Sequence, residues 1–167
     1  MIFITLGTQK FQFNRLLKYI DEQIKKGKIK EKVFAQIGGS TYLPKNYEYK
    51  DFIDKNEFAD KLEECELVIT HAGVGTIIAA INMDKKVIVV PRLAKYNEHV
   101  DDHQLEIADS FSKKNYVLSN RENIEELLSN IKKAKNMKFN KYNSSNEKIQ
   151  DLIINFIKKE VKNNERK

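Results

Sequence analysis

The chain has little cysteine and no long apolar run. Its one cysteine, Cys65, excludes an internal disulfide bond, and its place on the apolar face of a predicted helix favours a small buried hydrophobe over a reactive thiol. No apolar stretch approaches the roughly 20 residues that cross a bilayer, and no basic leader precedes the first apolar residues. We therefore expect neither a signal peptide nor a membrane span, and a cytoplasmic location.

Three motifs of common nucleotide-binding and hydrolytic enzymes are also missing. A Walker loop ends in Gly-Lys-Ser/Thr, and its absence excludes the usual ATPase site. The dinucleotide fingerprint is incomplete, because no Gly or Ala follows Gly75 at the required spacing and no acidic residue closes the next strand. A Ser-centred nucleophile elbow is absent as well. An NAD-binding role is therefore disfavoured, and hydrolase chemistry has no candidate nucleophile.

Excess positive charge is confined to the C-terminal part of the chain. The net charge is +6, of which residues 131–167 carry +7, from eleven Lys/Arg against four Asp/Glu, and residues 1–130 carry −1. A body without positive excess argues against nucleic-acid binding. The basic tail fits two alternatives: a solvated lysine-rich helix, or an element that sits near anionic lipid or an acidic partner.

Apolar runs of strand length alternate with amphipathic stretches of helix length. This alternation predicts an α/β fold, a Rossmann-like parallel sheet with helices on both faces. We expect strands at 2–6, 33–37, 67–69 and 87–90, weaker strands at 47–52 and 116–118, and helices at 13–26, 57–64, 76–82, 99–111 and 122–133. Residues 1–132 are assigned to one domain, 133–146 to a linker, and 147–167 to a basic amphipathic helix that either packs on the same domain or docks to a partner.

The segment from Val68 to Thr76 is the most informative part of the sequence. An apolar strand runs into a tight turn with two glycines, and the turn opens a predicted helix. Backbone N–H groups at the start of a helix bind anions. His71 and Thr76 add side-chain donors where glycine lets a ligand approach the backbone closely. The turn therefore predicts a diphosphate site and, with it, a nucleotide ligand.

Glycines also follow the other predicted strands. Gly7 and the pair Gly38-Gly39 stand just after a strand, as Gly73 and Gly75 do. In an open parallel sheet, ligands bind outside the carboxyl ends of the strands. We therefore expect residues 7–8, 38–41 and 71–76 to line one crevice.

Two histidines stand close together further along the chain. His99 and His103 are spaced i, i+4, with Asp101 and Asp102 between them. No Cys and no His-Glu pair completes a typical zinc set, so we expect no metal, and we place the two aspartates in the first turn of a helix. His103 and Gln104 would then face the crevice as neutral groups able to read sugar hydroxyls.

These motifs resemble a known group of enzymes. The run from Thr70 to Thr76, the strand at 87–91, and His103-Gln104 with Ala108 are similar to the nucleotide-sugar half of the inverting GT-B glycosyltransferases. That group includes the bacterial lipid-linked N-acetylglucosamine transferase of peptidoglycan synthesis. The opening residues 3–8 and the short length resemble the stand-alone catalytic subunit of two-component transferases. Those act in dolichol-linked N-glycan assembly and in bacterial capsule or exopolysaccharide assembly, and we favour the bacterial branch.

The resemblance implies a role for each candidate residue. Gly73, Val74, Gly75 and Thr76 would hold the diphosphate, with His71 the nearest candidate for stabilising the leaving group; Gly7 and Thr8 would lie near phosphate and sugar, Gln36 and Gly38 near uracil, and His103 and Gln104 against the donor sugar. One position departs from the pattern. The family usually places a Glu three residues after the Thr to grip the ribose, whereas this chain has Ala79.

The implied reaction transfers a hexose from a UDP-sugar to a polyprenyl-diphosphate-linked sugar, with inversion and without a metal or other cofactor. Negative charge grows on UDP as its bond to the sugar breaks, and the helix N-terminus would stabilise that charge. The base that deprotonates the acceptor would come from a separate, membrane-associated, acceptor-binding subunit, leaving this chain peripheral at the inner face of the membrane. The alternative is a non-catalytic partner that stabilises or enhances a glycosyltransferase, which Ala79 favours.

Overall fold

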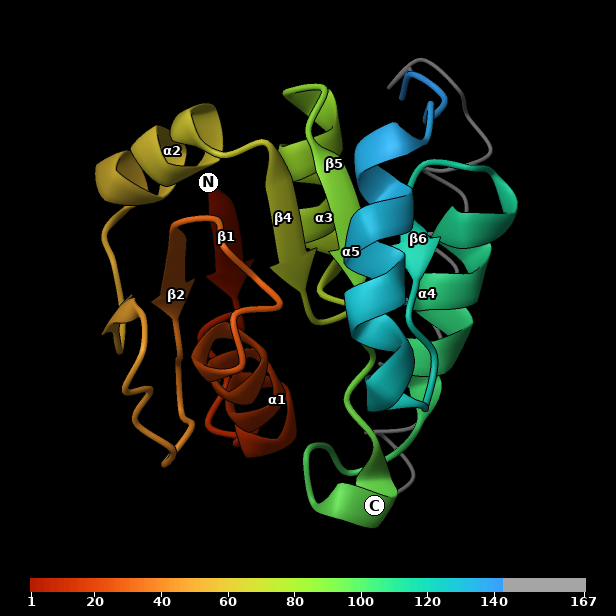
Figure 1. The fold of residues 1–167 in the computed structure, drawn as a ribbon. Helices are drawn as coiled ribbons and strands as arrows, with labels where there is room; N and C mark the ends of the chain where they lie inside the picture. Colours follow the sequence, from red (N-terminus) through yellow and green to blue (C-terminus); the bar gives the residue numbers. More distant parts are fainter. Residues whose placement is uncertain (143–167) are drawn as a thin grey trace.

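A computed structural model describes residues 1–142 and contains a six-stranded parallel sheet with helices packed on it (Figure 1). Its elements are β1 (Ile2–Thr5), α1 (Asn14–Lys25), β2 (Val33–Gln36), β3 (Glu48–Lys50), α2 (Lys55–Glu64), β4 (Leu67–Thr70), α3 (Val74–Asn82), β5 (Lys86–Val89), η1 (Ala94–Tyr96), α4 (His103–Lys113), β6 (Leu118–Ser119), η2 (Ile124–Glu126) and α5 (Leu127–Asn136). The strand order is β3-β2-β1-β4-β5-β6, and all neighbouring strands are parallel. The predicted Rossmann-like architecture is confirmed.

The central strands are covered on both faces, which explains their nearly continuous apolar sequences. Every residue of β1, β2 and β4 is buried. On one face, α1 and α5 pack through residues such as Leu16 and Ile131; on the other, α2, α3 and α4 pack through Leu62, Ile77 and Ile107. Figure 1 shows α1 and α5 in front of the sheet and α3 behind it. The core is therefore two apolar layers with the sheet between them.

The helix predicted from His99 begins instead at His103, so that the predicted boundary was wrong. Asp101 and Asp102, placed by the prediction in its first turn, precede the helix and bond to backbone. Asp102 Oδ1 accepts from the Ala94 N–H at 2.8 Å, and Asp101 Oδ1 accepts from the His103 N–H at 3.2 Å. Aspartate side chains that satisfy backbone groups outside a helix compete with helix formation.

Two further helix boundaries differ from the prediction. The C-terminal stretch forms a short 3₁₀ helix, η2, followed by α5, which continues to Asn136 and so into the predicted linker. Helix α2 begins at Lys55 because the Asp54 carboxylate accepts from the N–H groups of Asn56 and Glu57 at 2.8 and 2.9 Å. The helix predicted at 147–167 lies outside the described residues.

Strand β1 lies between β2 and β4, so the order of the strands reverses beside it. Ligands of open α/β sheets bind at such a switch point, outside the carboxyl ends of the strands. Three connections meet there: the β1–α1 loop (6–13), the β4–α3 turn (71–73) and the β5–α4 loop (90–102). We call this side of the sheet the carboxyl edge.

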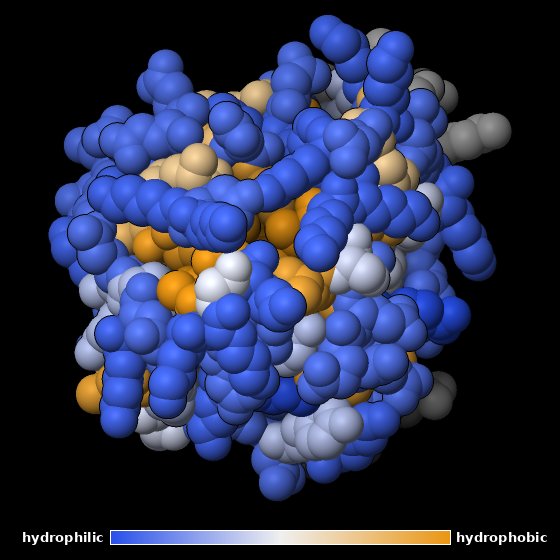
Figure 2. All heavy atoms as spheres, viewed as in Figure 1, coloured by the Kyte–Doolittle hydropathy of each residue, from blue (hydrophilic) through white to orange (hydrophobic). Residues whose placement is uncertain are grey.

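The opposite edge of the sheet holds a hollow of a different kind. It is lined by Met1, Ile2, Glu31, Glu66, Leu67, Lys86 and Lys135, and Lys135 forms an ion pair with Glu31. Figure 2 shows hydrophobic atoms in the middle of this view, surrounded by hydrophilic side chains.

Among the described residues, no helix combines the length and apolarity that a membrane span requires. The glycine turns, in contrast, all lie at the carboxyl edge or at a helix end.

Candidate functional site

The carboxyl edge brings three predicted glycine turns into direct contact. Gly38, at φ +57°, packs so closely on Gly7 that a Cβ there would lie 2.7 Å from the Gly7 carbonyl oxygen. Gly7 itself has φ +72°, a conformation that side chains rarely adopt. A Cβ on Gly7 would meet the ring of His71 at 2.7 Å. The ends of β2, β1 and β4 are thus joined by backbone packing that only glycine permits.

Helix α3 begins at this edge with amides that have no hydrogen-bond partner within residues 1–142. Gly73 is its N-cap residue and offers no side-chain bond, and the Ile77 N–H makes the bond to the Gly73 carbonyl at 3.0 Å. The N–H groups of the first helical residues, Val74, Gly75 and Thr76, have no carbonyl one turn earlier within the helix. These residues are partly or fully exposed. The amides therefore remain able to bind an anion from outside.

Gly75 differs from the other glycines of the edge. Nothing lies within 4 Å of the position that a Cβ would take there, and its φ is not in the left-handed region. Neither packing nor backbone conformation therefore requires glycine in this first helical turn. Glycine in a helix is less stable than alanine by roughly 0.5–1 kcal/mol. A ligand that approaches the backbone closely would account for a glycine at position 75.

His71 lies between two of the glycines. A Cβ on Gly73 would meet its Nε2 at 2.4 Å, so the imidazole fills the space that side chains at Gly7 and Gly73 would need. Burial, reinforced by the charge of Arg92 and by His99, lowers the pKa of His71 to about 4. The ring is therefore neutral near pH 7 in the ligand-free chain.

A layer of polar side chains beneath the edge sets the protonation of that ring. Thr70 Oγ1 donates to the Thr5 carbonyl at 2.8 Å, so this oxygen, 3.4 Å from His71 Nδ1, can only accept from it. The proton is thereby assigned to Nδ1, and Nε2 is an acceptor. Thr5 Oγ1 in turn donates to Gln36 Oε1 at 3.0 Å, which places the Gln36 side chain, predicted near uracil, inside the sheet.

Gln104, predicted to read the donor sugar, joins two connections of the edge. It is 4% exposed, and its Oε1 accepts from the Ala72 N–H at 3.2 Å and from the Arg92 N–H at 3.0 Å. The β4–α3 turn and the β5–α4 loop are held together by this one oxygen. Because the Gln104 oxygen already accepts two bonds, the amide nitrogen is the group of this side chain that can still donate to a ligand.

A buried charge network that the sequence analysis missed holds the β5–α4 loop. The Arg92 side chain donates to the carbonyls of Leu6, Phe11, Gln12 and Glu98 at 2.8 to 3.4 Å. Arg15 forms a double hydrogen bond with the Glu98 carboxylate, with both distances 2.9 Å, and Glu98 is fully buried. Burial lowers the pKa of Arg92 to about 10, and the guanidinium stays charged. A signal was present: an arginine directly after a buried strand, six residues before a glutamate.

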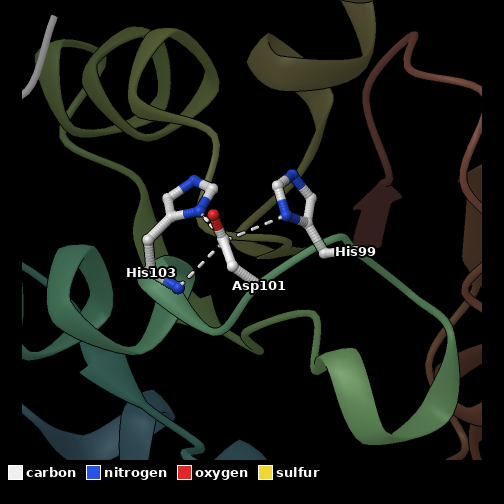
Figure 3. A group of neighbouring side chains, drawn as sticks. All are labelled: His99, Asp101 and His103. Atoms are coloured by element: carbon white, nitrogen blue, oxygen red, sulfur yellow. Dashed lines mark hydrogen bonds and ion pairs between the residues drawn. The ribbon is translucent and has the colours of Figure 1, made fainter. Parts of the chain in front are cut away.

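His103, Asp101 and His99 gather at the outer side of this loop (Figure 3). His103 is the first residue of α4, its ring is 21% exposed, and its Nδ1 contacts Asp101 Oδ1. Burial, followed by the neighbouring His103, lowers the pKa of His99. Thr8, the remaining predicted contact, is exposed in the β1–α1 loop. Ala79 lies on α3, packed against the apolar layer, and brings no polar group to a ribose.

The fold and the site define a Rossmann-like domain with an uncapped helix N-terminus at its switch point. Residues 1–162 match the family model described as the glycosyltransferase family 28 C-terminal domain. The chain therefore belongs to this glycosyltransferase family.

Two named relatives carry the sequence similarity. The chain is 33% identical over 105 residues to the UDP-N-acetylglucosamine transferase subunit ALG13 of Kluyveromyces lactis. The aligned residues cover 59% of this chain and 51% of that protein. It is 35% identical over 120 residues to the UDP-N-acetylglucosamine–N-acetylmuramyl-(pentapeptide) pyrophosphoryl-undecaprenol N-acetylglucosamine transferase of Prochlorococcus marinus, covering 68% and 32%. The chain thus spans about half or less of the length of these relatives.

Solved structures support the fold. An NMR structure of ALG13 aligns with a TM-score of 0.57 at 19% identity, covering 90% of this chain and 93% of that one. MurG of Acinetobacter baumannii aligns with a TM-score of 0.56 at 20% identity, covering 80% and 41%. The predicted equivalence to the C-terminal half of a GT-B glycosyltransferase is confirmed at the level of the fold.

Proposed function

We propose that this chain is the donor-binding subunit of an inverting glycosyltransferase that transfers a hexose from a UDP-sugar to a polyprenyl-diphosphate-linked acceptor. The observation that carries the proposal is the start of α3, where the amides of Val74, Gly75 and Thr76 lack intrahelical partners and Gly75 has open space before it. Charge grows on the diphosphate as its bond to the sugar breaks. Amides held in place before the reaction stabilise this charge without reorganisation and without a metal.

The names of the relatives support the donor and the carrier. Both are described as transferring N-acetylglucosamine from its UDP form, and one acts on a pyrophosphoryl-undecaprenol acceptor. UDP-N-acetylglucosamine is therefore the first hexose donor to test, and a polyprenyl diphosphate the first carrier. A capsule or exopolysaccharide product rests on the sequence resemblance alone.

A second polypeptide completes the proposed enzyme. The chain spans about half or less of its relatives, and one of those relatives is named a subunit. His71, the imidazole nearest the diphosphate site, is buried between glycines, and its pKa, lowered to about 4, makes it a weak base toward an acceptor hydroxyl. We assign the general base and the acceptor site to a membrane-associated partner.

The donor site is testable on this chain alone. In an ¹⁵N-labelled sample, UDP is expected to shift the amide signals of Val74, Gly75 and Thr76 in a saturable way. Uridine, which lacks the diphosphate, should leave these amides unmoved, and ADP should bind more weakly because its base differs. Unshifted amides at saturating UDP, or equal shifts with ADP, would contradict a UDP-sugar site.

The alternative function is a non-catalytic partner that enhances a transferase without holding donor. Ala79, which supplies no group for a ribose, is the observation that favours it. Co-expression with a candidate partner, followed by transfer assays in membranes with a panel of UDP-sugars, separates the two functions. Transfer that is lost when this chain lacks UDP affinity supports the enzyme, whereas transfer that persists supports the enhancer.

A further inference from the structure

Three metal-ligating side chains converge on the β5–α4 loop, away from the start of α3. One ring nitrogen from each of His99 and His103 and a carboxylate oxygen of Asp101 all lie within 4.8 Å of one another. Figure 3 shows both imidazoles turned toward the carboxylate between them. The three residues are spaced i, i+2 and i+4, and the segment before His103 is not helical. Because the backbone there is irregular, side chains two residues apart can point to the same place.

The geometry suits a small divalent ion. His99 Nδ1 lies 3.2 Å from Asp101 Oδ1, close to the separation of about 3.3 Å that two ligands have when each binds tetrahedral Zn²⁺ at its usual distance. His103 Nδ1 contacts the same oxygen directly. The Asp101 side chain is 50% exposed, so it can turn outward to admit an ion between itself and the rings.

The His99 ring is the independent observation that points to a ligand. Its side chain is only 9% exposed, and among the described residues the buried Nδ1 makes no well-formed hydrogen bond, although Asp101 Oδ1 lies 3.2 Å away. A buried polar atom without a well-formed hydrogen bond is costly, and such an atom calls for an explanation. The ring is held there by packing, with its centroid 5.0 Å from that of Phe11 and 4.6 Å from that of His103. The nitrogen is therefore fixed in place and aimed at the cluster.

We propose that His99, Asp101 and His103 bind a divalent transition-metal ion of the Zn²⁺ class. Two imidazoles and one carboxylate are a donor set that suits Zn²⁺ and its neighbours and not Mg²⁺ or Ca²⁺, which prefer oxygen ligands alone. Three protein ligands leave a fourth position for water or for a ligand oxygen. The neighbouring Arg92–Glu98–Arg15 network holds the loop in shape before the ion binds.

The ion changes what His103 offers to a ligand, a consequence that rests on the proposed sugar-binding role of this residue. In the neutral ring that donates from Nδ1 to Asp101, the Nε2 of His103 is a hydrogen-bond acceptor. Once Nδ1 ligates a metal, the proton moves to Nε2, which then donates. Metal binding therefore changes Nε2 of His103, at the edge of the donor site, from a hydrogen-bond acceptor to a donor, and it leaves the diphosphate site unchanged.

Zinc binding can be measured with Zn²⁺ alone on the full, tag-free chain. The protein has three histidines, and the third, His71, is buried between glycines, so imidazole signals are few and separable. Calorimetry is expected to give one Zn²⁺ per chain. In ¹⁵N spectra of the rings, Nδ1 of His99 and of His103 should shift on addition of Zn²⁺ while both nitrogens of His71 stay unchanged.

Variants test the ligand set. Asp101→Asn, at a half-exposed position, is expected to weaken Zn²⁺ binding by at least about tenfold, while Asp60→Asn, an exposed aspartate on α2, leaves it unchanged. Circular dichroism checks that both variants are folded. The absence of saturable Zn²⁺ binding to the wild-type chain, or wild-type affinity in folded Asp101→Asn, overturns the metal site. Because no nucleotide is present, either result leaves the UDP-binding proposal untouched.

Discussion

Two connections at the carboxyl edge are built in opposite ways. The β5–α4 loop is held by buried charges: Arg92 binds four carbonyls, and Glu98 accepts from Arg15 and from the Leu93 N–H. Among the described residues, the β4–α3 turn has two side-chain contacts, from the Ala72 N–H to Gln104 and between His71 and Thr70, and it then opens into amides that no side chain caps. The polar groups of the β5–α4 loop bond to one another and to nearby backbone. The amides at the end of the β4–α3 turn remain able to bind a ligand.

The contrast teaches how the site is preorganised. Amides that await a diphosphate must be held in place by something other than bonds to themselves. The β5–α4 loop supplies that support, because Gln104 bonds both to the turn and to the Arg92 N–H. The His71 ring, packed between Gly7 and Gly73, supports the turn from the other side. Changes in the loop should therefore alter stability, and changes at the start of α3 should alter binding.

Glu98→Gln should have the largest effect on stability. It removes the negative charge that faces two arginines, Arg15 and Arg92, and leaves buried cations without a counter-ion. We expect the free energy of unfolding to fall by about 3–5 kcal/mol, measured by urea denaturation. Glu122→Gln, which breaks an exposed pair with Lys95, is the control and should leave the midpoint unchanged. A loss in Glu98→Gln no larger than in the control would contradict the structural role of the network.

Acid should weaken the fold through His71. Its pKa is about 4 in the folded chain against 6.5 for an ordinary histidine. Between these values the unfolded chain binds a proton that the folded chain does not, so the stabilisation is present above pH 6.5 and is lost as the pH falls toward 4. The loss amounts to about 3 kcal/mol. Urea denaturation across this range should show a steeper pH dependence for the wild type than for His71→Gln, and equal slopes would refute the assignment.

Gly73→Ala should have a smaller effect on stability. The new methyl group would lie 2.4 Å from His71 Nε2, so the ring or the turn must move. Overpacking of this kind costs about 1–3 kcal/mol. Thermal unfolding monitored by circular dichroism checks this loss, with Gly75→Ala, which adds the same methyl group where nothing crowds it, as the control. Unchanged stability would mean that His71 does not wedge the turn.

The sequence predicted most of the fold, because parallel strands covered on both faces leave long apolar runs and glycines at their ends. It misplaced the start of α4 because Asp101 and Asp102 bond to backbone outside the helix, which helical spacing does not reveal. The turn at Gly73 was located from local letters. The Arg92–Glu98–Arg15 network was not, since its partners are up to 83 residues apart and meet only in the folded chain.

The same limit applied to the roles of individual residues. His71 was placed correctly at the end of β4, but its neutral state depends on burial and on Arg92 from the β5–α4 loop. Gln104 was read as a sugar contact, whereas its oxygen joins two connections. A metal at His99 and His103 was not expected, because no Cys and no His-Glu pair completes a typical zinc set, and the two aspartates between them were placed in a helix. The segment is not helical before His103, and there Asp101 lies close to both histidines.

The most direct test of the account is a calorimetric titration of UDP into wild type and Gly75→Ala, with unfolding measured on the same samples. Because no atom lies within 4 Å of the added methyl group and alanine favours helix, the variant should be as stable as wild type or up to about 1 kcal/mol more stable. Its affinity for UDP should fall at least about tenfold, since the methyl group occupies the approach to the α3 amides. Wild-type affinity in the stable variant would contradict the claim that these amides bind the diphosphate.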